Sequence, residues 1–239
     1  MLSKLVLLLI RKLKKDDSYK FKKNIGSKDL LIILLARATA FLRGLIFCLF
    51  FLRKFKILFK GKGSSIHHSS KLSFKSPLTI GENVSINCLG SNGIEFGSNV
   101  HIPDGSIIRC TGVISELGVG LKIGNNTGLG HNTFMNAQGG IKIGDDVIVG
   151  PNTSFLAENH VFSDPMIPIR KQGVSRKGIT IGSNTWIGSN VTILDGVEIG
   201  KGVVIGAGSL VTKSIPDNCI AFGSPCAISG KRNSLENEN

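Results

Sequence analysis

The chain is poor in aromatic residues, with one tryptophan and one tyrosine among 239 residues. Its five cysteines form no CxxC pair and no spacing typical of a metal site. They indicate reduced, small apolar side chains of a cytosolic protein. The 30 glycines follow no three-residue period, which excludes a collagen-like triple helix.

Acidic residues are scarce only at the start of the chain. Residues 1–60 hold 15 Lys and Arg against 3 Asp and Glu, whereas residues 61–239 hold 14 against 13. The net charge of +13 therefore belongs almost entirely to the leader. A nucleic-acid-binding domain needs its basic surface on the folded part. The charge consequently does not indicate a DNA or RNA partner.

The leader, MLSKLVLLLIRKLKKDD, also lacks the features of a signal peptide, because its positive charge follows the apolar run and no small-residue cleavage site comes after it. Residues 30–52 are long enough to span a bilayer but carry Arg37 and Arg43 near the middle. The 15 Leu, Ile and Phe favour insertion by roughly 0.5 kcal/mol each, and each central arginine opposes it by roughly 3 kcal/mol. Insertion across the bilayer is therefore not compelled.

We expect residues 1–60 to form a membrane-associating leader, as a helix or helical hairpin that lies in the interface. The basic residues at 53–60 would then meet anionic headgroups. This predicts a cytoplasmic protein that is peripheral on the inner face of the cell membrane. Two alternatives stay open: true spanning, and packing of the apolar face on the rest of the protein or on a neighbouring subunit.

From residue 80 onward, aliphatic residues followed by glycine recur every six positions. The clearest run is ITIGSNTWIGSNVTILDGVEIGKGVVIGAGSLVTKSI. The recurring residues in it are Ile181, Ile187, Ile193, Ile199, Ile205 and Val211. This period predicts short parallel strands joined by tight turns and stacked as coils, each strand pointing one aliphatic side chain inward. Gly and Asn between them permit the positive φ values of the corners.

Together with FGSPC at residues 222–226, this run resembles the hexapeptide-repeat acyltransferases, in particular the galactoside, maltose and polysaccharide O-acetyltransferase branch. The resemblance covers roughly residues 75–228. It implies an all-β fold, a left-handed parallel β-helix, that assembles as a homotrimer with acetyl-CoA in a groove between subunits. We therefore expect residues 61–228 to form the acyltransferase domain and residues 229–239 a disordered tail.

The six-residue interval is lost over residues 156–180, which we expect to leave the coils as a catalytic loop. The loop contains His160, and Pro165 and Pro168 would stiffen it. Acyl transfer to an alcohol needs a base, and histidine is the side chain that titrates nearest neutral pH. The resemblance implies that His160 is this base. The residues alone leave open an ordinary surface histidine, and His131 is the alternative base.

The resemblance extends to neighbours of the base. Asn136, in TFMNA, corresponds to an asparagine that binds the acceptor. Glu158 and Asn159 are candidates to orient the imidazole and stabilise its charged form, with Asn159 also placed near the acceptor. Arg170 and Lys171 would flank the cleft, where they either meet an anionic group or are simply solvated.

Acetyl-CoA has an extended arm that glycine-rich coils can hold through backbone amides and small side chains. The positions that the resemblance implies for this groove are Trp186, Ser189, Ala207, Thr212 and Lys213. Trp186 is equally well explained as an aromatic side chain on the outer face. Relatives often carry a basic residue where this chain has Ala227, so the phosphate contact stays open, with Lys231 and Arg232 as the nearest charges.

These features predict an acetyl-CoA-dependent O-acetyltransferase that acts on a sugar hydroxyl of a cell-surface polysaccharide or a lipid-linked precursor. The same fold could instead acetylate serine, an antibiotic alcohol or an amino sugar, or serve as a non-catalytic β-helix scaffold. A zinc carbonic anhydrase needs three histidines at one metal, two of them close in sequence. The intervals between His101, His131 and His160 do not fit that pattern, and no metal is predicted.

Overall fold

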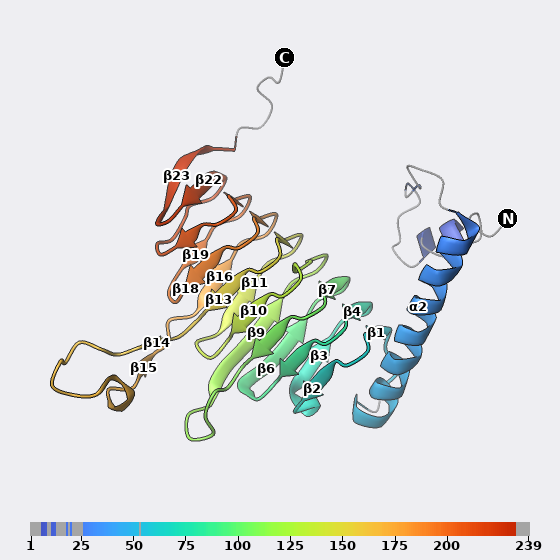
Figure 1. The fold of residues 1–239 in the computed structure, drawn as a ribbon, viewed down its shortest axis with the longest axis horizontal. Helices are drawn as coiled ribbons and strands as arrows, with labels where there is room; N and C mark the ends of the chain where they lie inside the picture. Colours follow the sequence, from blue (N-terminus) through green and yellow to red (C-terminus); the bar gives the residue numbers. More distant parts are fainter. Residues whose placement is uncertain are drawn as a thin grey trace, which may run out of the picture.

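The computed structural model describes residues 6–8, 11–12, 18, 20, 26–52 and 54–232. Short strands stack into a parallel β-helix with three flat faces, and a long helix lies across its N-terminal end (Figure 1). This confirms the predicted fold, an all-β, left-handed parallel β-helix. Of the expected leader, residues 1–60, the first 25 fall largely outside the described residues, as does the end of the tail.

The first face, sheet A, runs along the whole length of the described coils. Its strands are β1 (Leu58–Lys60), β4 (Leu78–Ile80), β7 (Val100–Ile102), β12 (Ile148–Val149), β17 (Trp186–Ile187), β20 (Val204–Ile205), β22 (Cys219–Gly223) and β23 (Cys226–Lys231). Gly128 bridges His101 on one side and Ile148 on the other, so it joins the early and late parts of the sheet. The antiparallel pair β22–β23 closes the C-terminal end.

The other two faces complete each coil. Sheet B contains β2 (Ser65–His67), β5 (Ser85–Asn87), β8 (Ile107–Arg109), β10 (Phe134–Asn136), β13 (Ser154–Leu156), β18 (Thr192–Leu194) and β21 (Leu210–Val211). Sheet C contains β3 (Leu72–Phe74), β6 (Gly90–Phe96), β9 (Gly118–Ile123), β11 (Ile141–Ile143), β16 (Ile179–Ile181) and β19 (Glu198–Ile199). A short 3-10 turn, η2 (Ser69–Lys71), links β2 to β3. Parallel pairing between coils satisfies the backbone hydrogen bonds.

The interior is a column of aliphatic side chains, one layer per coil. The six residues of the recurring run, from Ile181 to Val211, are each between 0% and 2% exposed, which confirms the inward position that the period predicts. Phe96 and Phe155 are the largest fully buried side chains. Because the strands of successive coils hold one another through the backbone, this narrow core needs few aromatic residues.

Cysteines belong to the same interior. Cys48, Cys88, Cys110 and Cys219 are buried, Cys226 is half-buried, and all five are free thiols. Burial raises the pKa of Cys88 and of Cys110 to about 12, so both remain thiols at neutral pH. This arrangement agrees with the reading of the cysteines as small apolar residues.

The coils turn at three corners, named here by the sheets they join. At the AB and CA corners a single residue with positive φ makes the tight turn, except between β3 and β4, where the turn contains the cis Ser76–Pro77 bond. These residues are mostly asparagines, for example Asn152 and Asn190 at the AB corner and Asn126 at the CA corner, with φ of 58°, 57° and 53°. Neighbouring coils are linked there by side-chain ladders. Asn126 donates to Asp146 at 3.1 Å, and Asn132 donates to Asn152 at 3.3 Å.

The BC corner is irregular. Two segments leave the coils there: a short excursion, residues 110–117, and the long loop, residues 157–178, since Leu156 still belongs to β13 and Ile179 already to β16. Both project from the same side of the β-helix in Figure 1. Every other part of the coil is repeated with little change, so variation in the chain is concentrated at this corner.

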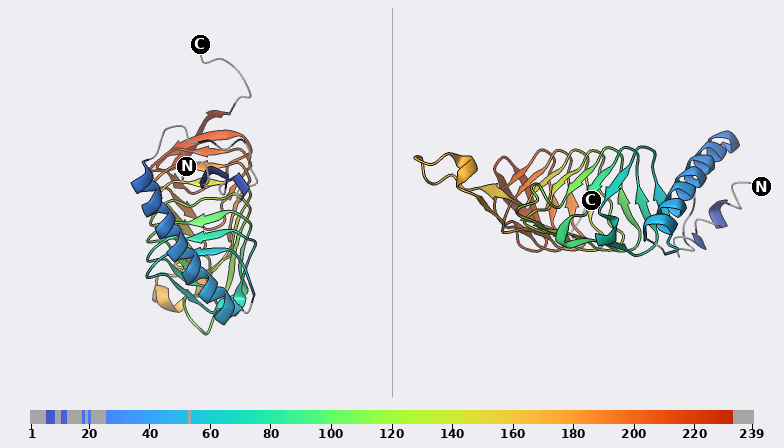
Figure 2. Two further views of the ribbon diagram at one scale, coloured as in Figure 1. Left: turned by 90° about the vertical axis from the view of Figure 1, so that its right-hand side faces the viewer. Right: turned by 90° about the horizontal axis from the view of Figure 1, so that it is seen from below.

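Helix α2 (Ser27–Phe47) continues into a π-helical turn, η1 (Cys48–Leu52), and closes the N-terminal end of the coils (Figure 2). Gly44 lets the helix approach β1 so closely that a Cβ there would lie 1.8 Å from the carbonyl oxygen of Leu58. Arg43 Nε donates to the carbonyl of Lys60 at 2.8 Å. The ring of Phe41 packs near that of Phe59, with 6.0 Å between centroids. One face of α2 therefore covers the open edge of the first coil.

Candidate functional site

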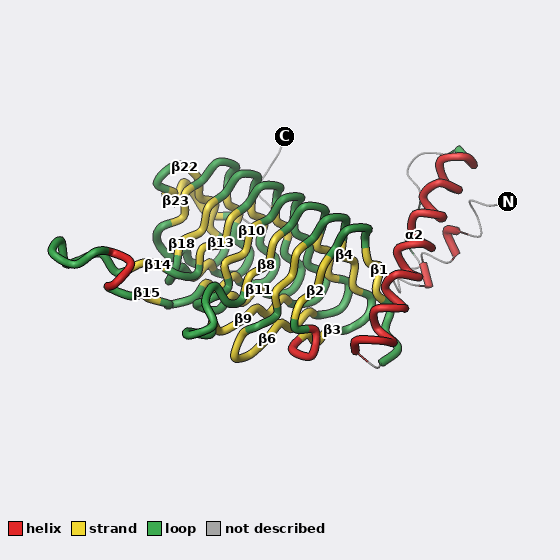
Figure 3. The backbone as a smooth tube through the Cα atoms, turned by 60° about the horizontal axis from the view of Figure 1, so that its bottom comes forward, coloured by secondary structure: helices red, strands yellow, loops and turns green. Residues whose placement is uncertain are grey.

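The long loop is a hairpin in its own right. β14 (Asn159–His160) pairs antiparallel with β15 (Val174–Ser175), with Asn159 opposite Ser175 and His160 opposite Val174. The loop projects well clear of the coils (Figure 3). Beyond its return strand, the N–H of Gly178 donates to the carboxylate of Asp195 at 2.7 Å. The hairpin is therefore anchored where it rejoins the coils at the BC corner.

The tip of the hairpin is held by its own hydrogen bonds. Gln172 Nε2 donates to the carbonyls of Asp164 and Ile167 at 2.7 and 2.6 Å. The turn η3 (Ile169–Lys171) follows Pro168, which agrees with a stiffening role for the proline. Arg170 and Lys171 are exposed on this tip. The loop thus has a defined shape although most of its side chains face solvent.

The structure places the three loop candidates differently. His160 and Asn159 are exposed at the start of the hairpin. Glu158 is mostly covered, and its two carboxylate oxygens accept from Gln138 Nε2 and from Arg176 Nε, both at 2.7 Å. Across residues 26–52 and 54–232, no side chain hydrogen-bonds the imidazole of His160. Orientation of His160 by Glu158 or Asn159 remains a proposal.

Asn136 lies on the coil next to the long loop. It ends β10, and its register partner on β13 is Leu156, directly before the loop. Its side-chain oxygen accepts from the backbone N–H of Gln138 at 3.3 Å. The half-buried amide of Asn136 and the exposed imidazole of His160 thus belong to the same corner on adjacent coils.

Four of the five cofactor candidates divide between two edges of sheet B, and the fifth, Trp186, lies on sheet A. Thr212 and Lys213 follow β21 and are exposed at the BC corner, on the same edge as Asn136 and the long loop. Ser189 and Ala207 lie at the AB corner, stacked on adjacent coils. From Ser189 to the end of β18 is at most about 18 Å of extended chain. One chain therefore presents the candidates on two edges rather than in one cleft.

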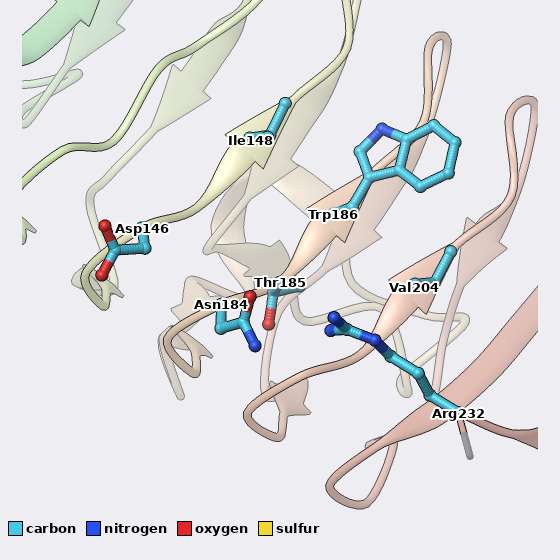
Figure 4. Close-up of a pocket in the computed structure, with 7 residues that line it drawn as sticks. All are labelled: Asp146, Ile148, Asn184, Thr185, Trp186, Val204 and Arg232. Atoms are coloured by element: carbon cyan, nitrogen blue, oxygen red, sulfur yellow. The ribbon is translucent and has the colours of Figure 1, made fainter. Parts of the chain in front are cut away.

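Trp186 lines a shallow cavity of about 330 Å³ on the outer face of sheet A (Figure 4). Its indole is 55% exposed beside Ile148, which is 63% exposed. The residues that line the cavity are Asp146, Ile148, Asn184, Thr185, Trp186, Val204 and Arg232. Arg232 Nη1 donates weakly to the carbonyl of Gly202 at 3.4 Å, and the guanidinium makes no other hydrogen bond to the described residues. The cavity combines a flat aromatic surface with one cation and one carboxylate.

Residues 178–213 match the family model described as bacterial transferase hexapeptide (six repeats). Residues 120–154 match the hexapeptide repeat of succinyl-transferase. The chain thus carries the hexapeptide repeats of the bacterial transferase family models. The two matched segments flank the long loop, so the recognisable repeats enclose the part of the chain that departs from them.

Relatives of this hexapeptide-repeat protein are acyltransferases by name. A galactoside O-acetyltransferase of Lactococcus lactis is 39% identical over 141 residues, which are 58% of this chain and 63% of that one. A probable acetyltransferase of Mycobacterium tuberculosis is 31% identical over 172 residues, 72% of this chain and 49% of the relative. The chain thus spans about half to under two thirds of the length of these curated relatives.

Among solved structures, the chain is similar to a variant of AntD, an N-acyltransferase from Bacillus cereus, in complex with dTDP and coenzyme A. The TM-score is 0.51 at 27% identity, over 64% of this chain and 84% of AntD. The likeness therefore extends over most of the AntD chain and includes the β-helix that carries the long loop here.

Two residues near this hexapeptide-repeat site escaped assignment from the sequence, Arg176 and Gln138, which hold Glu158. Arg232, named from the sequence as a nearby charge, lines the cavity beside Trp186. Arg176 follows the return strand of a hairpin whose pairing the six-residue period does not reveal. The signal that could have pointed to Arg176 is an alternation of side chains along the two strands of the hairpin. A pairing of that kind leaves Glu158 and Arg176 just outside the paired residues.

The remaining histidines form no metal site. Among the described residues, no three His, Cys, Asp or Glu side chains lie close enough to hold a metal ion. His131 Nδ1 lies 4.0 Å from Asp104 Oδ2, and both side chains are exposed. Partial burial and the charge of Arg37 lower the pKa of His101. His101 lies on β7, and His131 lies at the AB corner before β10, on the opposite edge of sheet B from the long loop.

Proposed function

We propose that this chain is an acetyl-CoA-dependent O-acetyltransferase that modifies a sugar hydroxyl of a cell-surface polysaccharide or its lipid-linked precursor. The observation that carries the proposal is the exposed His160, presented by an anchored hairpin at the one irregular corner of a hexapeptide-repeat β-helix. The galactoside O-acetyltransferase relative supports a sugar acceptor. Acetyl-CoA would supply the activated acyl group as a thioester.

In this proposal His160 is the general base. Its neutral imidazole accepts the proton of the acceptor hydroxyl as that oxygen forms its bond to the acyl carbon. Return of the same proton to the departing sulfur balances the reaction. Asn136 and Asn159 would hold the acceptor beside His160, and the fixed hairpin limits the motion that the reacting groups must lose.

The cavity on sheet A fits part of coenzyme A. The exposed face of Trp186 suits an apolar or aromatic portion of the ligand, and the Arg232 guanidinium suits a phosphate. Small side chains at Ser189 and Ala207 leave room for an extended arm along the neighbouring corner. Asp146 would oppose a phosphate placed next to it, so the Arg232 side of the cavity is the better anion site.

Assembly as a homotrimer would explain why the cofactor-binding candidates lie at both the AB and the BC edge of sheet B. Side chains that point outward from sheet C are mostly charged or polar, as in the exposed pair of Lys122 and Glu95, 3.2 Å apart. Sheet A instead exposes Ile148 and Trp186. In a closed ring, the AB corner of one copy can face the BC corner of the next. Light scattering at low micromolar concentration would report three times the chain mass, and a monomer that is active would contradict this arrangement.

The membrane remains our proposed location. The helix over residues 27–52 is long and apolar enough to cross a bilayer, with a mean hydropathy of 2.1 and 17% of its most apolar window buried. Its exposed apolar residues include Leu31, Ile32, Ile33, Leu35, Leu42 and Ile46. Exposed lysines close by, such as Lys54 and Lys62, would attract anionic headgroups.

Distance along the coils favours a glycan over a headgroup as acceptor. The long loop leaves β13, the fifth strand of sheet B counted from the end that α2 covers. At about 4.8 Å between strands, His160 would therefore lie about 20 Å from that end. A sugar several residues along a lipid-linked chain could reach this height.

The deciding experiment incubates purified protein with acetyl-CoA and a panel of mono- and oligosaccharides, and measures release of free thiol and acetylated product. We expect His160→Ala to lose about 100- to 10,000-fold in rate, with His131→Ala as the matched control that keeps its rate. If His160→Ala still released free thiol, His160 would not be the general base.

An amine acceptor is the second candidate, because AntD is an N-acyltransferase and its similarity covers most of that chain. The same panel should therefore pair each hydroxyl sugar with its amino counterpart. Acetylation of the amine alone would replace the O-acetyltransferase assignment.

Membrane binding is tested by flotation with vesicles of anionic or zwitterionic lipid. We expect Leu35→Glu together with Ile46→Glu, both at exposed positions, to abolish binding to anionic vesicles. Ile228→Glu, at an exposed apolar position at the opposite end, is the control that should still bind. Equal binding by all three proteins would exclude α2 as the contact.

A further inference from the structure

The root of the His160 hairpin is closed by an ion pair. Just outside the two paired positions of β14 and β15 stand Glu158 and Arg176, and Arg176 Nε donates to Glu158 Oε2 at 2.7 Å. Their side chains are only 11% and 16% exposed. Charges so far withdrawn from water are stabilised only when paired and hydrogen-bonded. The pair therefore fixes where the two strands of the hairpin begin and end.

The same pair reaches the neighbouring coil. The second oxygen of Glu158 accepts from Gln138 Nε2 at 2.7 Å, and Gln138 Oε1 accepts from the N–H of Gly112 at 2.7 Å. Gln138 is 6% exposed, so its amide uses these protein partners in place of water. One connected set of hydrogen bonds thus ties the hairpin root to β10 and to the short excursion.

Arg176 makes the link to the short excursion from the other side. Its Nη1 donates to the carbonyl of Leu117 at 3.2 Å and its Nη2 to that of Glu116 at 3.5 Å. The guanidinium spreads its donors over three groups, which a lysine could not do with the same geometry. Both irregular segments of the BC corner are therefore held by one side chain.

His160 itself depends on this arrangement. Its imidazole is exposed and has no hydrogen-bond partner among the side chains of residues 26–52 and 54–232. Its backbone is fixed by pairing with Val174 two residues from each member of the ion pair. What positions the imidazole is therefore the backbone of the hairpin, and what positions the hairpin is the Glu158–Arg176 pair.

We propose that Arg176, Glu158 and Gln138 form a clasp that positions His160 for catalysis by locking the root of its hairpin against the short excursion. This rests on the proposed function in taking His160 as the base. It assigns Glu158 to the hairpin root rather than to the imidazole. The three residues are positioning residues, since they act on the reaction only through the placement of His160.

A double-mutant cycle separates this role from others. We expect Arg176→Ala to lower kcat about 100-fold, the scale of a misplacement of about 1 Å, while KM for acetyl-CoA is unchanged. In a His160→Ala background the same substitution should have no further effect, because there is no base left to misplace. An equal further loss in that background would overturn the proposal. Lys122→Ala, which breaks an exposed ion pair on sheet C, is the matched control and should keep full activity.

Hydrogen exchange gives a readout that needs no catalysis. Arg176→Ala should speed exchange at the amides of residues 159–161 and 173–175, with the thermal midpoint of the coils unchanged. Unaltered exchange at these amides would contradict the clasp. A failure of every acceptor to support thiol release would instead count against the proposed function alone. Should Arg176→Ala fail to fold, Arg176→Lys keeps the charge but not the spread of donors, and intermediate exchange and kcat are expected.

Discussion

The AB and CA corners differ from the BC corner in almost every respect. At the first two, one asparagine, aspartate or glycine with positive φ makes nearly every turn, and ladders such as Asn126 to Asp146 tie neighbouring coils together. At the BC corner the turns vary in length, and two segments leave the coils altogether. Two repeated corners suffice to keep the strands in register. The third is then free to carry side chains for a different purpose.

This contrast predicts two kinds of variant. Changes to the interior and to the positive-φ asparagines of the AB corner, which lie outside the proposed coenzyme A cavity, should lower the free energy of unfolding and leave the rate per folded molecule unaltered. Changes at the BC corner should alter the rate and leave unfolding almost unaltered.

The largest effect on stability is expected at Phe155, which is fully buried on β13. Phe155→Ala should lower the free energy of unfolding by about 3–5 kcal/mol, because it removes apolar contacts and leaves a cavity. Leu156→Ala, at the next and half-buried position, should cost clearly less. Chemical denaturation of both variants measures this, and equal losses would contradict the inward column.

A second pair tests how tightly the coils stack. A Cβ at Gly130 would lie 2.3 Å from backbone atoms of Gly150 and Pro151, whereas a Cβ at Gly128 would meet nothing within 4 Å. Gly130→Ala should therefore cost about 1–3 kcal/mol of unfolding free energy, and Gly128→Ala close to none. If thermal unfolding reports the reverse order, the stacking described for the AB corner is wrong.

A smaller effect is expected at the AB corner turn itself. Asn190 has φ of 57°, a conformation that alanine adopts at a cost of about 1 kcal/mol. Asn190→Ala should be less stable than the native protein by about that amount, and Asn190→Gly should match it. The rate of thiol release per folded molecule should be the same in all three proteins. A loss of rate in Asn190→Gly would show that the AB turn serves more than the fold.

The smallest expected effect is the dependence of stability on pH from His101, on sheet A. Burial and the charge of Arg37 lower its pKa in the folded state below the ordinary 6.5, although Asp104 opposes this. The unfolded state then binds more protons, so stability should fall as pH drops below about 6.5. His101→Gln should flatten this part of the stability curve, measured as thermal midpoints between pH 5 and 7. An unchanged slope would mean that His101 is not the group responsible.

Much of the frame could be predicted because it is periodic. The interval of six places Ile187 and Ile193 inward with no knowledge of any contact, and the break after Phe155 locates the long loop. The clasp could not be predicted in this way, since Arg176 meets Glu158 across a hairpin and Leu117 across two coils. The cavity that joins Trp186 to Arg232 likewise depends on how the C-terminal hairpin folds back.

The leader shows the same limit. Composition predicts an apolar, basic segment but not which of its faces is free. The close approach at Gly44 and the contact of Arg43 with Lys60 decide that one face packs on β1. The alternative of packing on the rest of the protein is therefore realised for that face, and the exposed face is the one that we assign to the membrane.

The most direct test of the central claim compares His160→Ala and Asn190→Ala in one assay that records the thermal midpoint and the rate of thiol release per folded molecule. We predict a native midpoint with the rate lost for His160→Ala, and a lowered midpoint with the native rate for Asn190→Ala. If His160→Ala kept its rate, or if both variants lost rate and stability together, the division between a structural frame and a catalytic corner would be wrong.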